Sequence, residues 1–140
     1  MNIKPNKVIF SAERSELTAS ENANRIEKAI DMLRRDGFYP MVGQGVYRYD
    51  NGERCSETSL LLSSDNIQGH QDQVNVAMSV ALMFNQESIL IVDSEDNAQL
   101  QYLDGRQVNL GRLTEVSEAE ALSGGTGYSI FGGRYWICKR

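Results

Sequence analysis

A hairpin signal in the first half of the chain constrains the fold more than any other feature. The turn Asp50-Asn51-Gly52 separates two extended segments, Tyr39 to Tyr49 and Cys55 to Ser63. An Asn-Gly pair suits a type I′ turn, because that turn requires positive φ at both central positions. The two segments are therefore predicted to pair as antiparallel neighbouring strands.

An amphipathic helix is predicted on each side of this hairpin. The first helix follows Ser20, which suits an N-cap, and its apolar positions recur at helical spacing until Asp36-Gly37. After the loop Asp65 to Gly69, the second helix runs from Gln71 to Phe84-Asn85. The polar side of the first helix is interpreted as a solvated face stabilised by i,i+4 pairs. That face carries Glu27, Asp31 and Arg34 or Arg35.

Short apolar strands lie outside the two helices. Lys7 to Ser11 precedes the first helix, and the near-continuously apolar Ser88 to Val92 follows the second. The order strand, helix, strand, strand, helix, strand is typical of the split βαβ pattern. The sequence therefore predicts an α+β fold with a ferredoxin-like (βαββαβ) core, a two-layer sandwich with both helices on one face of the sheet.

The last third of the chain is interpreted as an addition to that core. It contains the extended pieces Ala98 to Leu103 and Gln107 to Leu113, a helical stretch near Ser117 to Leu122, and a final hairpin from Tyr128 to Cys138 around Gly132-Gly133. At 140 residues the chain is expected to form a single domain, 1–140, with extra C-terminal strands.

Composition excludes several classes of function. A net charge of −5 without a basic stripe argues against a protein that binds nucleic acid through phosphate neutralisation. No apolar segment approaches the roughly 18 residues that would cross a membrane. Cys55 and Cys138 have neither metal-knuckle spacing nor disulfide density, so free thiols and a cytoplasmic location are expected. His70 has no partner at ligand spacing, and no metal site is predicted.

The hairpin carries a candidate site for a compact organic cation. Tyr47 and Tyr49 lie two residues apart on one strand, and Glu57 lies across the turn. Aromatic ring faces and a carboxylate both attract positive charge. The alternative, which composition alone favours, is a surface ladder of ordinary strand residues.

Dispersed matches along nearly the whole chain favour the site. They are FSAERS at Phe10 to Ser15, Glu57 within CSETS, QVNVAMSV at Gln73 to Val80, the strand SILIV, and the final YSIFGGRYWI. In this order and spacing the chain resembles the phage-encoded enzymes that cleave S-adenosylmethionine, which were long called hydrolases and are better described as lyases.

The resemblance implies a ferredoxin-like core assembled into homotrimers, with S-adenosylmethionine bound between subunits. It also implies a reaction without metal or redox cofactor, in which the substrate's own carboxylate displaces methylthioadenosine and leaves homoserine lactone. For a phage-encoded enzyme the location is the host cytoplasm. Depletion of the methyl donor would counteract host restriction-modification.

The resemblance also implies a glutamate and a tyrosine at the site. Glu57 matches the glutamate, and Tyr47 is the first choice for the tyrosine, with Tyr49 beside it. Ser11 and Arg14, at the end of the first strand, are candidates for binding the substrate carboxylate or ribose.

The register of the hairpin decides whether Tyr47 and Glu57 can act together. A strict two-residue Asn51-Gly52 turn pairs Val46 with Glu57, which leaves Tyr47 on the opposite face and places Gln44 and Arg48 beside Glu57. A longer loop, or a bulge between Tyr47 and Glu57, would bring the two onto one face. Both registers are compatible with the sequence.

Two other functions are compatible with the sequence. One is a non-catalytic ferredoxin-like oligomer that binds a nucleotide or small effector between subunits. The other is a structural or inhibitory protein whose acidic surface competes with nucleic acid for a partner.

Overall fold

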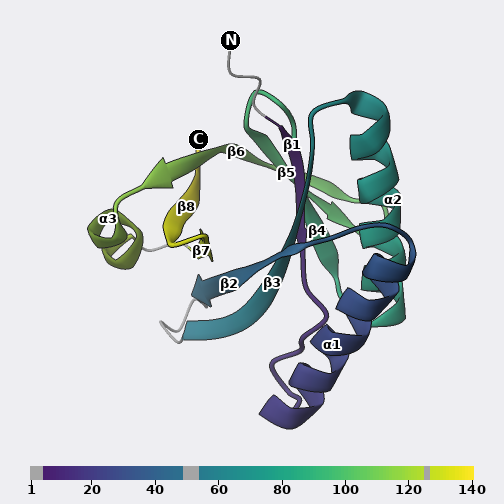
Figure 1. Ribbon diagram of the computed structural model, residues 1–140. Coiled ribbons are helices and arrows are strands. Elements are labelled where there is room, and N and C mark those ends of the chain that lie inside the picture. Colours follow the sequence, from purple (N-terminus) through teal and green to yellow (C-terminus); the bar gives the residue numbers. More distant parts are fainter. Residues whose placement is uncertain (1–4, 49–53, 125–126) are drawn as a thin grey trace.

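A computed structural model of the chain describes residues 5–48, 54–124 and 127–140, with residues 47 and 48 described by their backbone alone. Eleven elements follow one another in these residues (Figure 1). They are β1 (Asn6–Phe10), α1 (Ala19–Arg35), β2 (Met41–Arg48), β3 (Arg54–Ser64), α2 (Ile67–Met83), β4 (Ser88–Val92), β5 (Asn97–Tyr102), β6 (Gln107–Val116), α3 (Glu118–Ser123), β7 (Tyr128–Phe131) and β8 (Arg134–Lys139).

The strands form one closed antiparallel barrel. Around the wall their order is β1-β3-β2-β7-β8-β6-β5-β4, and β4 pairs with β1 to complete the circle. The predicted two-layer ferredoxin-like sandwich is therefore wrong. The first six elements occur in the expected order, but the strands that were interpreted as additions to a finished core instead form half of the wall.

Closure depends on two pairings between distant parts of the chain. The edge strand β2 pairs with β7 through Gln44–Ile130 and Val46–Tyr128, and β6 pairs with β8 from Arg112–Lys139 to Val116–Tyr135. The final hairpin turns at Gly132 and Gly133, both with positive φ, which confirms the turn predicted there. That hairpin joins the two open edges, so that a sheet with free edges becomes a barrel.

Apolar side chains alternate between the interior of the barrel and its outer face. The interior is filled from seven strands by Ile9, Val92, Ala98, Leu113 and Phe131, with Leu61, Leu90, Leu110, Trp136 and Cys138 packed against them. The barrel is thus packed along most of its length.

Cys55 and Cys138 are both free thiols, as predicted, and burial raises the pKa of the Cys138 thiol.

The outer face carries two further apolar clusters. The larger one lies between the strands β1, β3 and β4 and the helices α1 and α2, and includes Phe10, Leu33, Leu60, Val80 and Ile89. A smaller cluster, around Val46, Ala121 and Tyr128, lies where α3 covers the other side of the wall. Figure 1 shows the two long helices together on one side of the barrel and the short helix α3 on the opposite side.

Side-chain caps determine where the helices begin. Thr18, rather than the predicted Ser20, is the N-cap of α1, because Thr18 and Glu21 form a reciprocal capping box. The second helix begins at Ile67, inside the predicted loop, because the Asn66 side chain accepts a hydrogen bond from the Gly69 backbone N–H. Among the described residues, none of the helices has both the length and the apolar character needed to cross a bilayer.

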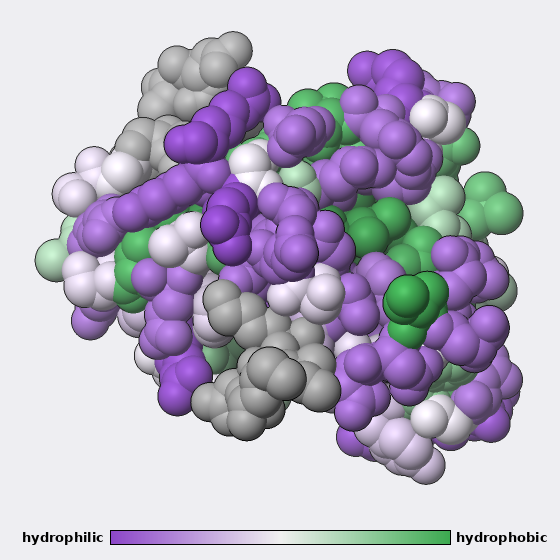
Figure 2. All heavy atoms as spheres, turned by 90° about the horizontal axis from the view of Figure 1, so that it is seen from above, coloured by the Kyte–Doolittle hydropathy of each residue, from purple (hydrophilic) through white to green (hydrophobic). Residues whose placement is uncertain are grey.

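Much of the molecular surface is hydrophilic, as Figure 2 shows for one face. Three exposed apolar residues nevertheless gather at the start of β2: Tyr39 is 74% exposed, Met41 52% and Val42 52%. Three large apolar side chains are thus exposed within four residues of one strand and its lead-in.

Gly43 in β2 lies directly beneath Phe131. A Cβ built on Gly43 would lie 2.2 Å from the Ile130 carbonyl oxygen and 2.4 Å from Phe131 Cδ1. Replacing Gly43 with alanine is expected to destabilise the barrel by about 1–3 kcal/mol, because the ring and the β7 backbone would both have to move. Chemical denaturation of Gly43→Ala measures this loss. Val42→Ala, at the neighbouring exposed position, is expected to change stability by less than about 0.5 kcal/mol; equal losses would contradict the close-packing explanation.

Candidate active site

The register of β2 against β3 places the candidate residues. Gly45, not Val46, lies opposite Glu57, and Tyr47 lies opposite Cys55. The pairing that a strict two-residue turn would give is therefore shifted by one residue. Residues directly opposite in a ladder lie on the same face, so positions 47 and 57 share a face. Tyr49 and the predicted Asn51-Gly52 turn lie outside the described residues.

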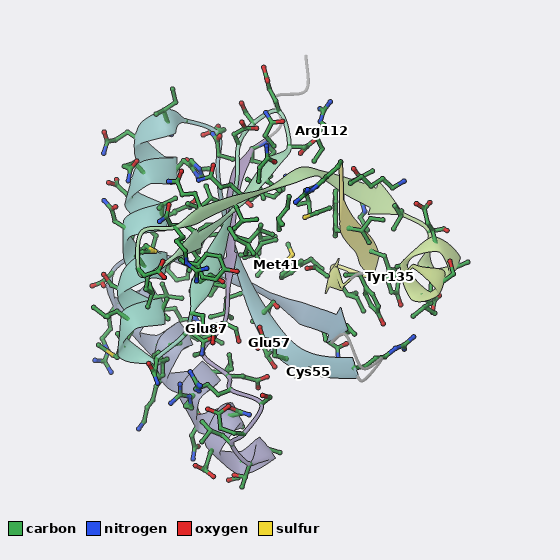
Figure 3. The ribbon with its side chains drawn as sticks, turned by 180° about the vertical axis from the view of Figure 1, so that it is seen from behind. Met41, Cys55, Glu57, Glu87, Arg112 and Tyr135 are labelled. Atoms are coloured by element: carbon green, nitrogen blue, oxygen red, sulfur yellow. The ribbon has the colours of Figure 1, made fainter. Side chains whose placement is uncertain are left out.

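Alternation along β3 gives the two sides of this strand different roles. Leu60 and Leu62 pack beneath the helices, whereas Leu61 packs against the barrel interior. Side chains alternate between the two sides of a strand, and Glu57 lies four positions from Leu61. Glu57 therefore belongs to the interior side, and Ser56 and Thr58 belong to the outer side. Figure 3 shows Glu57 and Cys55 on β3, where the strand curves away from α1 and α2 towards the side that α3 occupies.

A hollow of about 350 Å³, which we call the hairpin hollow, lies over β2 and β3 at this point. It is lined by Glu13, Val42, Gly43, Gln44, Ser56, Glu57 and Thr58. Gln44 donates a hydrogen bond from Nε2 to Ser56 Oγ across the two strands. The lining of the hairpin hollow therefore includes amide- and hydroxyl-bearing residues from the outer side of the hairpin and two acidic residues, Glu13 and Glu57, of which Glu57 belongs to the interior side of β3.

A second hollow of about 460 Å³, the helix hollow, adjoins the first along α1. Glu13 and Thr58 belong to both linings, and α1 adds Ala23, Ile26, Glu27, Ile30, Asp31 and Arg34. Glu27, Asp31 and Arg34 are exposed, as predicted for the solvated face of this helix, and they also border the helix hollow. Together the two linings contain four carboxylates and one arginine, which favours a positively charged ligand.

The segment between β1 and α1 is fixed to Thr58 by side-chain hydrogen bonds. Ser11 Oγ donates to the Thr58 carbonyl oxygen at 2.6 Å, and the Thr58 backbone N–H donates to Glu13 Oε1 at 2.6 Å. The Glu13 backbone N–H in turn donates to Ser11 Oγ at 3.1 Å. Ser11 is 4% exposed, so its hydroxyl is a buried structural group in the isolated chain.

Arginines anchor the same segment to the end of α2. Arg14 donates to the Glu16 carboxylate and to the Asn85 carbonyl oxygen, and the hydrogen bond from Arg14 lowers the pKa of the Glu16 carboxyl. Arg25 Nε donates to the Ala12 carbonyl oxygen at 2.7 Å, and its Nη2 donates to that of Phe84. Arg14 lines neither hollow, and its partners within the chain give it a role in holding the segment.

The predicted site residues are thus only partly brought together. Glu57 and Gln44 line the hairpin hollow, and Tyr47 shares the face of Glu57 by backbone register. Arg48 pairs with Arg54 near the end of the ladder. Sequence reasoning missed Glu13, Ser56 and Thr58; the position of Glu13 within the FSAERS match was the one available signal for it.

Groups that could hold a metal were also considered. No set of three or more His, Cys, Asp and Glu side chains in the described ranges is arranged to bind a metal ion. His70 lies at the start of α2, and burial lowers its pKa. These residues supply no metal centre near either hollow.

A comparison with known families adds evidence that is independent of this geometry. The model of the S-adenosylmethionine lyase family matches residues 8–139, which covers almost the whole chain. The chain belongs to the S-adenosylmethionine lyase family. This enzyme family takes its name from S-adenosylmethionine, a substrate with a sulfonium cation, which agrees with the excess of carboxylates around the two hollows. No curated protein matches the chain in sequence.

Ser11 is expected to contribute to stability as well as to the shape of the site. Ser11→Ala would leave the Thr58 carbonyl and the Glu13 N–H without their side-chain partner, which costs about 1–3 kcal/mol for a poorly solvated group. Urea unfolding of the two proteins measures the difference. Ser15→Ala, an exposed position in the same segment, is the control and is expected to match the parent protein; a Ser11 variant of parental stability would contradict the assigned role.

Proposed function

We propose that this protein cleaves S-adenosylmethionine to methylthioadenosine and homoserine lactone. The observation that carries the proposal is the match to the lyase family over residues 8–139, together with a recess that contains two carboxylates, Glu13 and Glu57. A carboxylate-lined recess suits a substrate that carries an ammonium and a sulfonium group.

The proposed reaction is an intramolecular displacement. A carboxylate oxygen of the substrate attacks its own γ-carbon, forming the C–O bond of the lactone. The bond from the γ-carbon to sulfur breaks, and its electron pair neutralises the sulfonium as methylthioadenosine leaves. The sulfonium is already a good leaving group, so the reaction requires no external nucleophile.

The protein contributes by folding the methionine tail and excluding water. Holding the two reacting atoms in an attack geometry can supply on the order of 7–11 kcal/mol of the barrier reduction. In this proposal Glu57 binds the cationic end of the substrate, and Tyr47 assists from the same face of the hairpin. Gln44, which lines the hairpin hollow from the other face of β2, is proposed as a further substrate contact, as are Arg48 and Tyr49.

Activity is tested by incubating the purified protein with S-adenosylmethionine and following methylthioadenosine by chromatography. Glu57→Gln is expected to lower kcat/KM about ten- to hundredfold, because the negative charge that strengthens the contact with the cationic substrate is removed. The early product should be homoserine lactone, and homoserine should appear only later. Intact substrate would refute the lyase function and favour a binding module; full activity of Glu57→Gln would remove only Glu57 from the mechanism.

We further propose that the active form is a homotrimer with substrate bound between subunits. The exposed residues Tyr39, Met41 and Val42 support this arrangement, because Val42 lines the hairpin hollow and the other two lie next to it in the chain. A neighbouring subunit on this apolar surface would close the hollow against water.

The trimer is tested by light scattering of the purified protein. Met41→Glu is expected to reduce the mass from three chains to one and to abolish activity, because it places a charge in the interface. Ile67→Glu, at an exposed apolar position at the start of α2, is the control and should leave both mass and activity unchanged. A trimer that survives Met41→Glu would place the interface elsewhere.

The proposed biological role is consumption of the methyl donor in the host cytoplasm by a phage-encoded enzyme. Removal of S-adenosylmethionine would starve the restriction-modification systems that depend on it.

A further inference from the structure

The wall of the barrel has a gap where β1 ends. The β1–β3 ladder runs from Asn6–Ser64 to Phe10–Leu60, so Thr58, two positions further along β3, would lie opposite Ala12 if the register continued. At Ala12 the chain has left the sheet and turns towards α1. The polar backbone groups of Thr58 therefore lose the strand partner that an uninterrupted ladder would provide.

Side chains replace that missing strand. Ser11 Oγ satisfies the Thr58 carbonyl and Glu13 Oε1 satisfies the Thr58 N–H, each at 2.6 Å. That N–H belongs to the peptide bond that joins Glu57 to Thr58. A carboxylate from the β1–α1 segment therefore holds the backbone directly beside Glu57.

Glu13 has acceptor capacity beyond this hydrogen bond. A carboxylate has two oxygens and about four lone-pair sites. Among the residues that the structure describes, the side-chain hydrogen bond of Glu13 uses Oε1, which accepts from the Thr58 N–H. Glu13 is half-buried, and it lines the hairpin hollow and the helix hollow alike, so it lies at the junction of the two recesses.

We propose that Glu13 is a substrate-binding residue with two tasks. Oε1 positions the peptide beside Glu57, while the other carboxylate oxygen accepts a hydrogen bond from the ammonium group of the substrate. This inference rests on the proposed lyase function and adds a second carboxylate to it. The ammonium is the partner because a sulfonium has no N–H or O–H to donate.

Two substitutions separate the tasks. Glu13→Gln keeps an oxygen that can accept from the Thr58 N–H but removes the charge, whereas Glu13→Ala removes both. Glu13→Gln is expected to raise the KM for S-adenosylmethionine about ten- to hundredfold with a smaller change in kcat. Glu13→Ala is expected to lower kcat about ten- to hundredfold below that of Glu13→Gln, because the backbone beside Glu57 loses its anchor.

Binding of two neutral-sulfur ligands, measured by calorimetry, identifies the group that Glu13 contacts. S-adenosylhomocysteine keeps the ammonium without the sulfonium, and methylthioadenosine has neither. Glu13→Gln should weaken the binding of S-adenosylhomocysteine by the same factor as it raises the KM for S-adenosylmethionine. The affinity for methylthioadenosine should stay unchanged. Glu95→Gln, which removes a negative charge at the exposed turn between β4 and β5, is the control. Its KM and its affinity for both ligands should equal those of the parent protein.

Each contrary result overturns a stated part of the inference. If Glu13→Gln has the same KM as the parent protein, Glu13 does not contact the substrate. If Glu13→Gln and Glu13→Ala have equal kcat, Glu13 does not position the peptide beside Glu57. Loss of methylthioadenosine binding would indicate a distorted recess instead of a missing charge. These comparisons require a parent protein that turns over substrate, and an inactive parent protein would refute the lyase function itself. Thermal unfolding of both Glu13 variants checks that they are folded.

Discussion

Pairing of the final hairpin with two distant strands is the interaction on which the rest of the structure depends. β7 covers the open edge of β2, and β8 covers that of β6, so each exposed row of N–H and C=O groups acquires a partner. The same pairing brings Phe131 over Gly43 and closes the interior of the barrel. The hairpin that carries Glu57 is consequently held along both edges of β2, although its candidate residues come from the first half of the chain.

The site forms where this regular wall is interrupted. β1 stops two residues short of Thr58, and the chain crosses to α1 at the place where the two hollows meet. Ser11 donates a hydrogen bond to the Thr58 carbonyl and Glu13 accepts one from the Thr58 N–H, which replaces the lost strand contacts. Arg14 and Arg25 attach the crossing segment to the carbonyl end of α2. An opening in a packed barrel thus acquires polar and acidic walls, while the Thr58 N–H and carbonyl keep hydrogen-bond partners.

Local patterns in the sequence predicted the local structure well. Helical spacing identified α1 and α2, the SILIV segment identified β4, and Gly132-Gly133 identified the last turn. Alternation shows which residues share a face of a strand, but it does not name the neighbouring strand, so the pairing of β7 with β2 was not foreseen. For the same reason the β2–β3 register was left open, and a one-residue shift changed the neighbours of Glu57. Glu13 was overlooked because its partner Thr58 lies 45 residues away.

The late position of the closing hairpin has a consequence for synthesis on the ribosome. The half-barrel of β1 to β4 can pair its strands early, but the apolar interior side stays uncovered until residues 128–139 have emerged. Contacts that join the two ends of a chain form slowly, because a long loop must close first. The nascent protein therefore exposes an apolar concave surface until residues 128–139 have been synthesised, and a chain truncated before them would be a target for chaperones and proteases.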